Sequence, residues 1–490
     1  MRYETVIGME VHVELGTASK MFCRCSADHF QVPPNEHICP VCTSQPGSLP
    51  VINGRAVELT VMTGMALHCQ VQPHSVFARK NYIYPDLPKG YQISQYERPL
   101  CTEGWVEVAG ERGPKRIGVA RVHLEEDTGK LVHEGRASLV DYNRAGVPLM
   151  EIVSDSSLRS AEEAYLYLLQ IRQVVRYLGA SSGDMEKGAM RCEANISVRP
   201  EGAQAYGTKV EVKNLNSFRS VRNAVRYEVE RQVGVLEGGG RVVQVTMGWD
   251  EAAGVTREQR SKESSEDYRY FPEPDLLPVE LSPEWIARVR GALPELPEAK
   301  ADRLAAQYGL GRQEVELLTL DQAVAAYFEA AAAWPGVDAR QVGNWITGPV
   351  FQRLKDGEIP IEAARLTPQA LSELVGLVQQ GTLNLTAARE VFAVLWEQGG
   401  SPAAVVEERG LAQISDSAAL AELVTRAIAD NPEAAAKVRA GNDKPLQFLM
   451  GQVMKASRGK ANPALVVRLL KEQLGAEPRT ERPRRHGEDQ

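Results

Sequence analysis

The chain has 490 residues, of which 43% are hydrophobic and 24% are charged, and its formal net charge is −8. This length suits two to four domains with cores of their own, and the composition excludes an intrinsically disordered chain. The sequence contains no run of about eighteen apolar residues and no apolar segment after the N-terminus, so it predicts neither a membrane span nor a secretion signal. A cytoplasmic location is the corresponding expectation.

The first strand pattern is the clearest one in the sequence. From Thr5 to Leu15 apolar residues alternate with polar ones, so that Glu10, His12 and Glu14 share one face of the strand. An imidazole flanked by two carboxylates at this spacing is a suitable set of metal ligands or of acid and base groups. The alternative is the polar outer face of a half-exposed strand.

Four of the seven cysteines are clustered in two pairs, Cys23 with Cys25 and Cys39 with Cys42. Two thiolate pairs meet the tetrahedral coordination of structural zinc, although C-x-C is a less common spacing than C-x₂-C. His29 and His37 lie between the pairs as substitute ligands, and the alternative is a set of four free thiols. A site with four protein ligands leaves no open position, which argues against catalysis by this metal.

A loop rich in aromatic and basic residues follows. It runs from Arg79 to Tyr91 and contains Lys80, Tyr82 and Lys89. Such a loop can bind a nucleotide or line a polar passage. A packed surface loop is the alternative interpretation of the same composition.

Three consecutive carboxylates, Glu125, Glu126 and Asp127, end an alternating apolar stretch. Adjacent acids repel one another at a strand end unless a cation or water compensates, and Mg²⁺ shared with phosphates is a common compensation. A solvated charged turn is the alternative.

Further along, Glu151 interrupts an apolar strand, and burying it there requires a cation, a strong hydrogen bond or an arginine partner.

Two later strand patterns, Met190–Arg199 and Lys209–Lys213, carry charged residues on one face. Together with the earlier acids they predict a lined cavity on one side of a sheet.

Helices are predicted from near Ser160, where Glu163 has capping-box spacing, and from near Ser217. This mixture of strands and helices predicts an α+β domain around an antiparallel sheet.

Six prolines between residues 272 and 297 mark a change in composition. Beyond them the sequence is rich in Ala and Leu with helical periodicity, which predicts two all-α parts, residues 291–405 and 406–475. Residues 476–490 are polar and are predicted to be disordered. From residue 441 onward ten Lys or Arg residues stand against six Asp or Glu residues, so the C-terminal end is basic despite the negative total.

The common nucleotide-binding loop motifs are absent. The sequence has no G-x₄-G-K-[ST] and no G-x-G-x-x-G, which excludes a P-loop or Rossmann nucleotide site. A Gly/Ser-rich amidase stretch is also absent, as is a Cys and His pair in a protease-like context. The chain therefore has no evident means of its own to release ammonia from an amide.

Several long strings of this sequence resemble the family of B subunits of bacterial aspartyl/glutamyl-tRNA amidotransferases. The strings are Tyr3–Val13, Arg79–Tyr96, His123–Leu131, Ser138–Val153, Arg191–Pro200, Lys213–Arg219 and Asp267–Leu276. The resemblance covers essentially residues 1–475. It implies a cradle-like catalytic domain over residues 1–290 with a glutamine synthetase-like fold, a helical domain over residues 291–405, and a helical tRNA-binding tail over residues 406–475.

The resemblance also implies an activity, that of a carbon–nitrogen ligase with glutamine as the nitrogen donor. ATP would phosphorylate the side chain of Glu or Asp misacylated on tRNA(Gln) or tRNA(Asn), and ammonia would displace the phosphate. An amidase A subunit would supply the ammonia, and a small C subunit would complete a heterotrimer. A non-discriminating aminoacyl-tRNA synthetase is a further expected partner. The alternatives are a non-catalytic tRNA-binding zinc protein and an ATP-dependent ligase of a free amino acid.

Residue by residue, the resemblance implies metal ligands, ATP-binding groups and tRNA contacts. The Mg²⁺ ligands would be Glu10, His12, Glu125 and Glu151, and Glu126 and Asp127 belong to the same catalytic motif. The groups that bind ATP or substrate would be Lys80, Tyr82, Lys89, Lys213 and Arg219. The four clustered cysteines match zinc-type ligands of the family, and tRNA contacts would lie at Lys455, Lys460 and Asn462. Glu193 is a departure, because Asp is expected there, but the charge is preserved.

Overall fold

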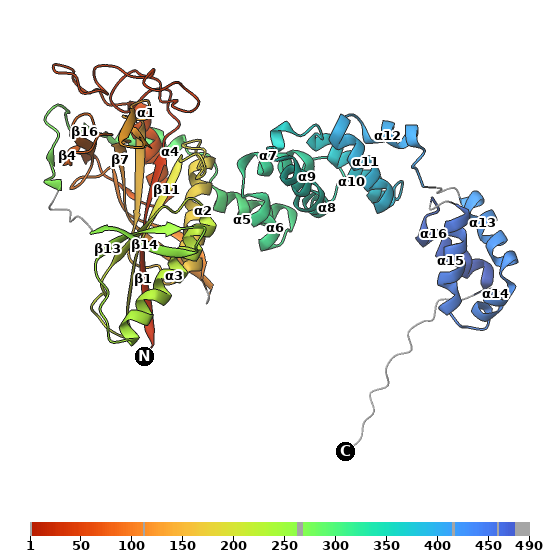
Figure 1. The fold of residues 1–490 in the computed structure, drawn as a ribbon. Coiled ribbons are helices and arrows are strands. Elements are labelled where there is room, and N and C mark those ends of the chain that lie inside the picture. The colour runs from red at the N-terminus through yellow and green to blue at the C-terminus, as the bar shows by residue number, and fades with distance from the viewer. Residues whose placement is uncertain (1, 111–112, 262–267, 414–416, 458–459, 476–490) are drawn as a thin grey trace. The chain divides into compact units, whose positions relative to one another are not determined.

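The computed structural model describes residues 2–110, 113–261, 268–413, 417–457 and 460–475. The chain forms two compact units, residues 1–300 and 301–490, and each is described by itself (Figure 1). The predicted disordered end, residues 476–490, lies outside the described residues. None of the described helices combines the length and the apolar character needed to cross a membrane.

A sheet of nine strands organises the first unit, in the order β14-β13-β12-β11-β1-β10-β7-β6-β2. The strand bounds are β1 Tyr3–Glu14, β2 Gln70–Val71, β6 Cys101–Gly110, β7 Gly113–Glu126, β10 Pro148–Ser154, β11 Met190–Pro200, β12 Val210–Lys213, β13 Val245–Asp250 and β14 Val255–Ser261. Neighbouring strands pair antiparallel except β12 and β13, which are parallel. The α+β prediction is confirmed, and the expected antiparallel sheet is mixed at this one described pair.

Helices pack on the apolar face of this sheet. Helix α2 (Ala161–Tyr177) contacts β6, helix α3 (Phe218–Glu237) contacts β11, and helix α1 (Gly54–Ala66) contacts β7. As the sequence predicts, Ser160 and Ser217 are the N-caps of α2 and α3, because each hydroxyl accepts a bond from a backbone N–H three residues on. Helix α4 (Pro283–Gly291) joins the same core. The opposite face of the central strands is left for polar residues.

Three small sheets accompany the large one. They are formed by β4 (Ala78–Asn81), β5 (Tyr91–Ser94) and β15 (Phe271–Pro272), by β3 (His74–Ser75) and β16 (Val279–Glu280), and by β8 (Lys130–Glu134) and β9 (Ala137–Asp141). Strand β5 also contacts β7 of the large sheet. The predicted aromatic and basic loop therefore begins as a strand, β4, and ends as another, β5.

The second unit consists of helices around two separate apolar cores. The first core is built mainly by α5 (Pro297–Tyr308), α6 (Arg312–Leu318), α7 (Gln322–Ala332), α8 (Ala339–Trp345), α9 (Phe351–Gly357), α10 (Pro368–Gln379), α11 (Leu385–Gln398) and α12 (Pro402–Arg409). The second is built by α13 (Ser417–Asp430), α14 (Pro432–Arg439), α15 (Lys444–Ala456) and α16 (Pro463–Leu474). The cores divide between Leu411 and Leu420, a few residues beyond the predicted boundary at residue 405.

Candidate active site

The register of three central strands gathers the polar residues of the site. Strand β1 lies between β10 and β11, and its His12 pairs with Glu151 on β10 and with Arg191 on β11. Two residues earlier, Glu10 pairs with Glu193 on β11. Side chains alternate between the two faces of a strand, so these residues all face away from the helix-covered core.

A cavity of about 690 Å³ lies on this face of the sheet. The residues of the predicted site and its acidic motif that line it are Glu10, His12, Lys80, Tyr82, Glu125, Asp127, Glu151 and Lys213. Its walls come from β4, β5 and the segment that contains Tyr268 and Tyr270. The cavity predicted from the charged strand faces is therefore present, and most of the residues implied as ligands or ATP contacts meet there.

His12, Glu125 and Glu151 form the first group of potential metal ligands. Nε2 of His12 lies 3.5 Å from a carboxylate oxygen of each glutamate. One ligand atom from each residue lies within 4.8 Å of the others. The hydroxyl of Ser94 donates to Glu125 at 2.9 Å, which holds that carboxylate in place. A carboxylate pair with one imidazole is a donor set that suits a hard divalent ion.

The electrostatics of this group show a demand for positive charge. Burial lowers the pKa of His12, but the carboxylates of Glu151 and Glu125 outweigh that effect and raise it to about 9. Burial likewise opposes the charge of Lys80, while Glu125 raises its pKa. The two buried carboxylates also raise the pKa of His123 against the effect of burial, so they favour positive charge on the imidazoles and the ammonium beside them.

A second group of carboxylates, Glu10, Glu193 and Glu211, lies in the same cavity, with ligand atoms within 4.8 Å of one another. Asn195 donates to Glu10 at 2.7 Å, Lys213 contacts Glu193 at 2.9 Å, and Thr246 donates to Glu211 at 2.7 Å. Position 193 has Glu where the family resemblance predicts Asp, and its carboxylate belongs to this second group of potential ligands.

Two residues of the site were not predicted from the sequence as site residues. Glu211 was seen only as part of a charged face, and the pairing of β12 with β11 is what brings it to Glu193. His123 precedes the acidic run by two positions and lies 3.1 Å from Glu151 through Nε2. His123 and Glu125 are two positions apart in β7, so their side chains lie on the same face of the strand. This two-residue spacing is the feature of the sequence from which His123 could have been predicted.

The acidic run divides among three environments. Glu125 joins the metal-ligand group, whereas Glu126 points to the other face of β7, where Lys89 contacts it at 2.6 Å and the Ile93 N–H donates to it at 3.0 Å. Asp127 accepts a bond of 2.5 Å from Arg191. Burial raises the pKa of Asp127, but the nearby arginines outweigh it and bring the pKa to about 2. Glu126 and Lys89 are not lining residues of the cavity.

Arg219 also lies away from the cavity. It is an exposed residue in the first turn of α3 and is absent from the lining residues. Of the five residues expected to bind ATP or substrate, the cavity therefore contains Lys80, Tyr82 and Lys213.

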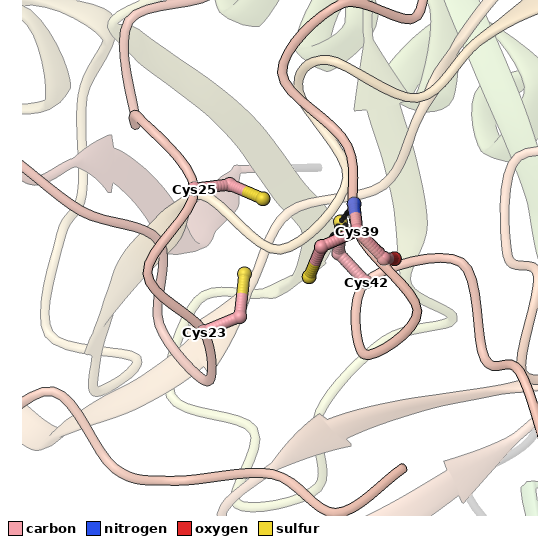
Figure 2. A group of neighbouring side chains, drawn as sticks. All are labelled: Cys23, Cys25, Cys39 and Cys42. Carbon is pink, nitrogen blue, oxygen red and sulfur yellow. Dashed lines mark hydrogen bonds between the residues drawn. The ribbon is translucent and has the colours of Figure 1, made fainter.

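The four clustered cysteines meet as a potential metal site in the segment between β1 and α1. Figure 2 shows the sulfurs of Cys23 and Cys25 on one side and that of Cys39 facing them, with Cys42 behind. Their Sγ atoms lie within 4.8 Å of one another, which fits tetrahedral coordination of one ion. A hydrogen bond from Cys23 lowers the pKa of Cys42 to about 5, so one thiolate is already favoured.

The residues around the cysteines define this site further. Lys20 is fully buried, and its Nζ lies 3.7 Å from Sγ of Cys42 and donates to the carbonyl of Tyr142 at 3.1 Å. The two histidines considered as substitute ligands have other partners. His29 contacts Glu14 at 2.9 Å, and His37 contacts the carbonyl of Asp28 at 2.6 Å.

The predicted tRNA contacts lie on α15 and in the residues just before α16. Lys455 on α15 and Lys460 are exposed, so both ammonium groups are accessible to phosphates. Asn462 is the N-cap of α16, and its side-chain oxygen accepts the N–H groups of Ala464 and Leu465. The side-chain oxygen of Asn462 thus has a structural role in the chain itself.

Comparison with known proteins identifies the family. Residues 5–287 match the model of the GatB/GatE catalytic domain, and residues 326–474 match that of the GatB domain. The aspartyl/glutamyl-tRNA(Asn/Gln) amidotransferase B subunit of Roseiflexus castenholzii is 52% identical over 97% of this chain and 100% of its own length. The protein of the same name from Thermomicrobium roseum is 53% identical over 97% of this chain and 99% of its own. The chain belongs to the family of aspartyl/glutamyl-tRNA(Asn/Gln) amidotransferase B subunits.

Proposed function

We propose that this chain is the subunit of a tRNA-dependent amidotransferase in which the misacylated amino acid is converted to its amide. The substrate would be Glu esterified to tRNA(Gln), Asp esterified to tRNA(Asn), or both. The observation that carries the proposal is that two clusters of potential metal ligands, one of which includes His12, lie in a single cavity. Lys80 and Lys213 line the same cavity.

Activation of a carboxylate by ATP brings several negative charges into one place. His12, Glu125 and Glu151 would hold one Mg²⁺ ion, and Glu10, Glu193 and Glu211 are a second set of suitable donors. When bound there, Mg²⁺ would supply positive charge that offsets the negative charge of the phosphates during transfer. Lys213 lies beside the second set, where its ammonium can contact phosphate, and Lys80 lies beside the first.

The chemistry then takes two displacements. A carboxylate oxygen of the amino acid attacks the γ-phosphorus of ATP, and ADP leaves. Ammonia next attacks the acyl carbon, the bond to phosphate breaks, and the proton lost by nitrogen leaves with the phosphate. Lys80 would orient the incoming carboxylate, and its electrostatic interaction with Glu125 and Glu151 supports this role.

We further propose that other subunits complete the enzyme. The relatives are named as B subunits of an amidotransferase. An amidase A subunit would release ammonia from glutamine, and a small C subunit would complete the heterotrimer, with a non-discriminating aminoacyl-tRNA synthetase as a further partner. The exposed Lys455 and Lys460 would contact tRNA phosphates. Zinc held by the four cysteines would stabilise the segment between β1 and α1.

The test is ATP-dependent amidation of misacylated tRNA by the assembled enzyme. Glu125→Gln and His12→Ala should lower kcat by on the order of a hundredfold or more, because each removes a metal ligand. Glu134→Gln, an exposed change on β8, is the matched control and should keep the rate. Full activity of both site variants would overturn the assignment. Amidation of free glutamate by the wild-type enzyme would instead support a ligase of free amino acids.

A further inference from the structure

A group of tyrosines forms one wall of the cavity, and the reaction described above does not use them. The rings of Tyr96 and Tyr270 are stacked, with centroids 4.3 Å apart and planes within 7° of each other. Tyr268 packs edge-on against Tyr270 at 6.2 Å, and the ammonium of Lys80 lies 5.0 Å from the Tyr268 ring. We call Tyr96, Tyr268 and Tyr270 the tyrosine wall.

The tyrosine wall is open to solvent on one side. Tyr96 is 40% exposed, although it lines the cavity. An exposed aromatic face at the mouth of a polar cavity offers a planar ligand stacking without full enclosure. Unpaired nucleic-acid bases are ligands of this kind, because each base has a flat face and stacks on aromatic side chains with little regard to sequence.

Arg121 is a second, independent sign of a ligand on this side. It lies on β7, pairs with Val153 of β10 and lines the same cavity. Its Nε is buried without a hydrogen-bond partner, and its guanidinium forms no ion pair with any residue that the structure describes. A buried guanidinium donor without an acceptor is costly, and a phosphate or carboxylate oxygen would satisfy it.

The two sides of the cavity differ in the ligand they suit. On the β11 and β12 side lie Glu10, Glu193 and Glu211 with Lys213, which suit the metal-bound phosphates of a nucleotide. The tyrosine wall and Arg121 lie by β5 and β7, and they combine an aromatic surface with one unpaired cation. That combination matches one base and one phosphodiester, and not a triphosphate with about four negative charges.

We propose that the tyrosine wall and Arg121 bind the single-stranded 3′ end of the aminoacylated tRNA, with the terminal base stacked at Tyr96 and a backbone phosphate on Arg121. This inference rests on the proposed function and deepens it by assigning a subsite to the RNA. It places the ester-linked amino acid beside Lys80 and the first metal-ligand group, where its carboxylate must react.

The experiment compares two RNAs on the assembled enzyme, intact tRNA and the same tRNA without its terminal adenosine. Tyr96→Ala should weaken binding of intact tRNA by about tenfold, the range of one base stack. The same change should leave the affinity for truncated tRNA unaltered, and Tyr96→Phe should restore binding of intact tRNA. Arg121→Gln should raise the KM for aminoacyl-tRNA severalfold and leave the KM for ATP unchanged.

Two results would overturn the subsite. One is an equal loss of affinity for both RNAs in Tyr96→Ala, which would mean that Tyr96 does not contact the terminal base. The other is a raised KM for ATP with unchanged RNA affinity, which would place adenine on the tyrosines. Binding of uncharged RNA does not require turnover. The subsite can therefore fail while wild-type amidation succeeds, and an inactive wild-type enzyme would count against the proposed function alone.

Discussion

Nε2 of His12 lies 3.5 Å from Oε2 of Glu151, and the two residues are opposite each other in the ladder between β1 and β10. The distance is therefore a product of strand register. A slip of one residue would turn His12 toward the apolar core and dismantle the first metal-ligand group. The site is built on the most regular part of the fold, where neighbouring strands limit its movement.

Metal affinity at this group should rise with pH. The carboxylates hold the pKa of His12 at about 9 against the effect of burial, so Nε2 must lose a proton before it binds a metal. The apparent association constant for Mn²⁺ should rise by up to about tenfold per pH unit between pH 7 and 9. Calorimetric titration measures this constant. His12→Gln should abolish the slope, and an unchanged slope in that variant would contradict the assignment.

Without metal, the same histidine should stabilise the fold at neutral and acidic pH. Its folded pKa, about 9, is above the ordinary value of 6.5, so the contribution is fully present below pH 6.5 and is lost as pH rises through about 9. The loss corresponds to about 3 kcal/mol in the free energy of unfolding. Urea denaturation of metal-free protein at several pH values tests this, and His12→Gln should remove that part of the pH dependence.

The cysteine cluster should hold one zinc ion per chain. Cys39→Ser should release the metal and lower the melting temperature, as should a chelator on the wild-type protein. Lys20→Met should weaken zinc binding without removing a ligand, because the buried ammonium beside Cys42 offsets thiolate charge. Elemental analysis and competition with a chromogenic chelator measure both effects. Unaltered zinc affinity in Lys20→Met would show that the ammonium has no such role.

The ion pair of Lys89 and Glu126 should be important for stability. Both side chains are largely buried, so Lys89→Met leaves a buried carboxylate without its partner and should cost about 3–5 kcal/mol. Arg55→Ala breaks an exposed pair with Glu58 and should cost no more than about 1 kcal/mol. Chemical denaturation of the two variants provides the comparison, and equal costs would contradict the burial argument.

Binding of tRNA should depend on salt through the last helices. Replacing Lys455 and Lys460 together with Ala should reduce the slope of log affinity against log salt by about two units or less, since each phosphate contact contributes about 0.7–0.9. Lys187→Ala, an exposed change in the first unit, is the control. Filter binding at several salt concentrations measures the slope, and an unchanged slope in the double variant would exclude these contacts.

Local patterns in the sequence predicted much of this structure. Alternation in β1 correctly placed Glu10 and His12 on one face, and the Ser160 and Ser217 caps marked the starts of α2 and α3. Each of these features depends on residues close in sequence. The α+β class followed from the same elements.

Features that depend on distant pairing were not predicted. Glu211 joins Glu10 and Glu193 only because β12 pairs with β11, and strand order cannot be derived from periodicity. The partner of Glu126 is Lys89, which lies 37 residues away in sequence. Likewise, Tyr96 and Tyr270 stack although 174 residues separate them, as their numbers show. Long-range packing decides these contacts.

The central claim is that ATP activates the side-chain carboxyl of the tRNA-bound amino acid. The most direct measurement uses misacylated tRNA whose Glu or Asp side-chain carboxyl is labelled with ¹⁸O, and follows the label during amidation by mass spectrometry. If an acyl phosphate forms, one labelled oxygen moves from the carboxyl group to inorganic phosphate for each amide produced. Amide formation with phosphate free of label would contradict the account.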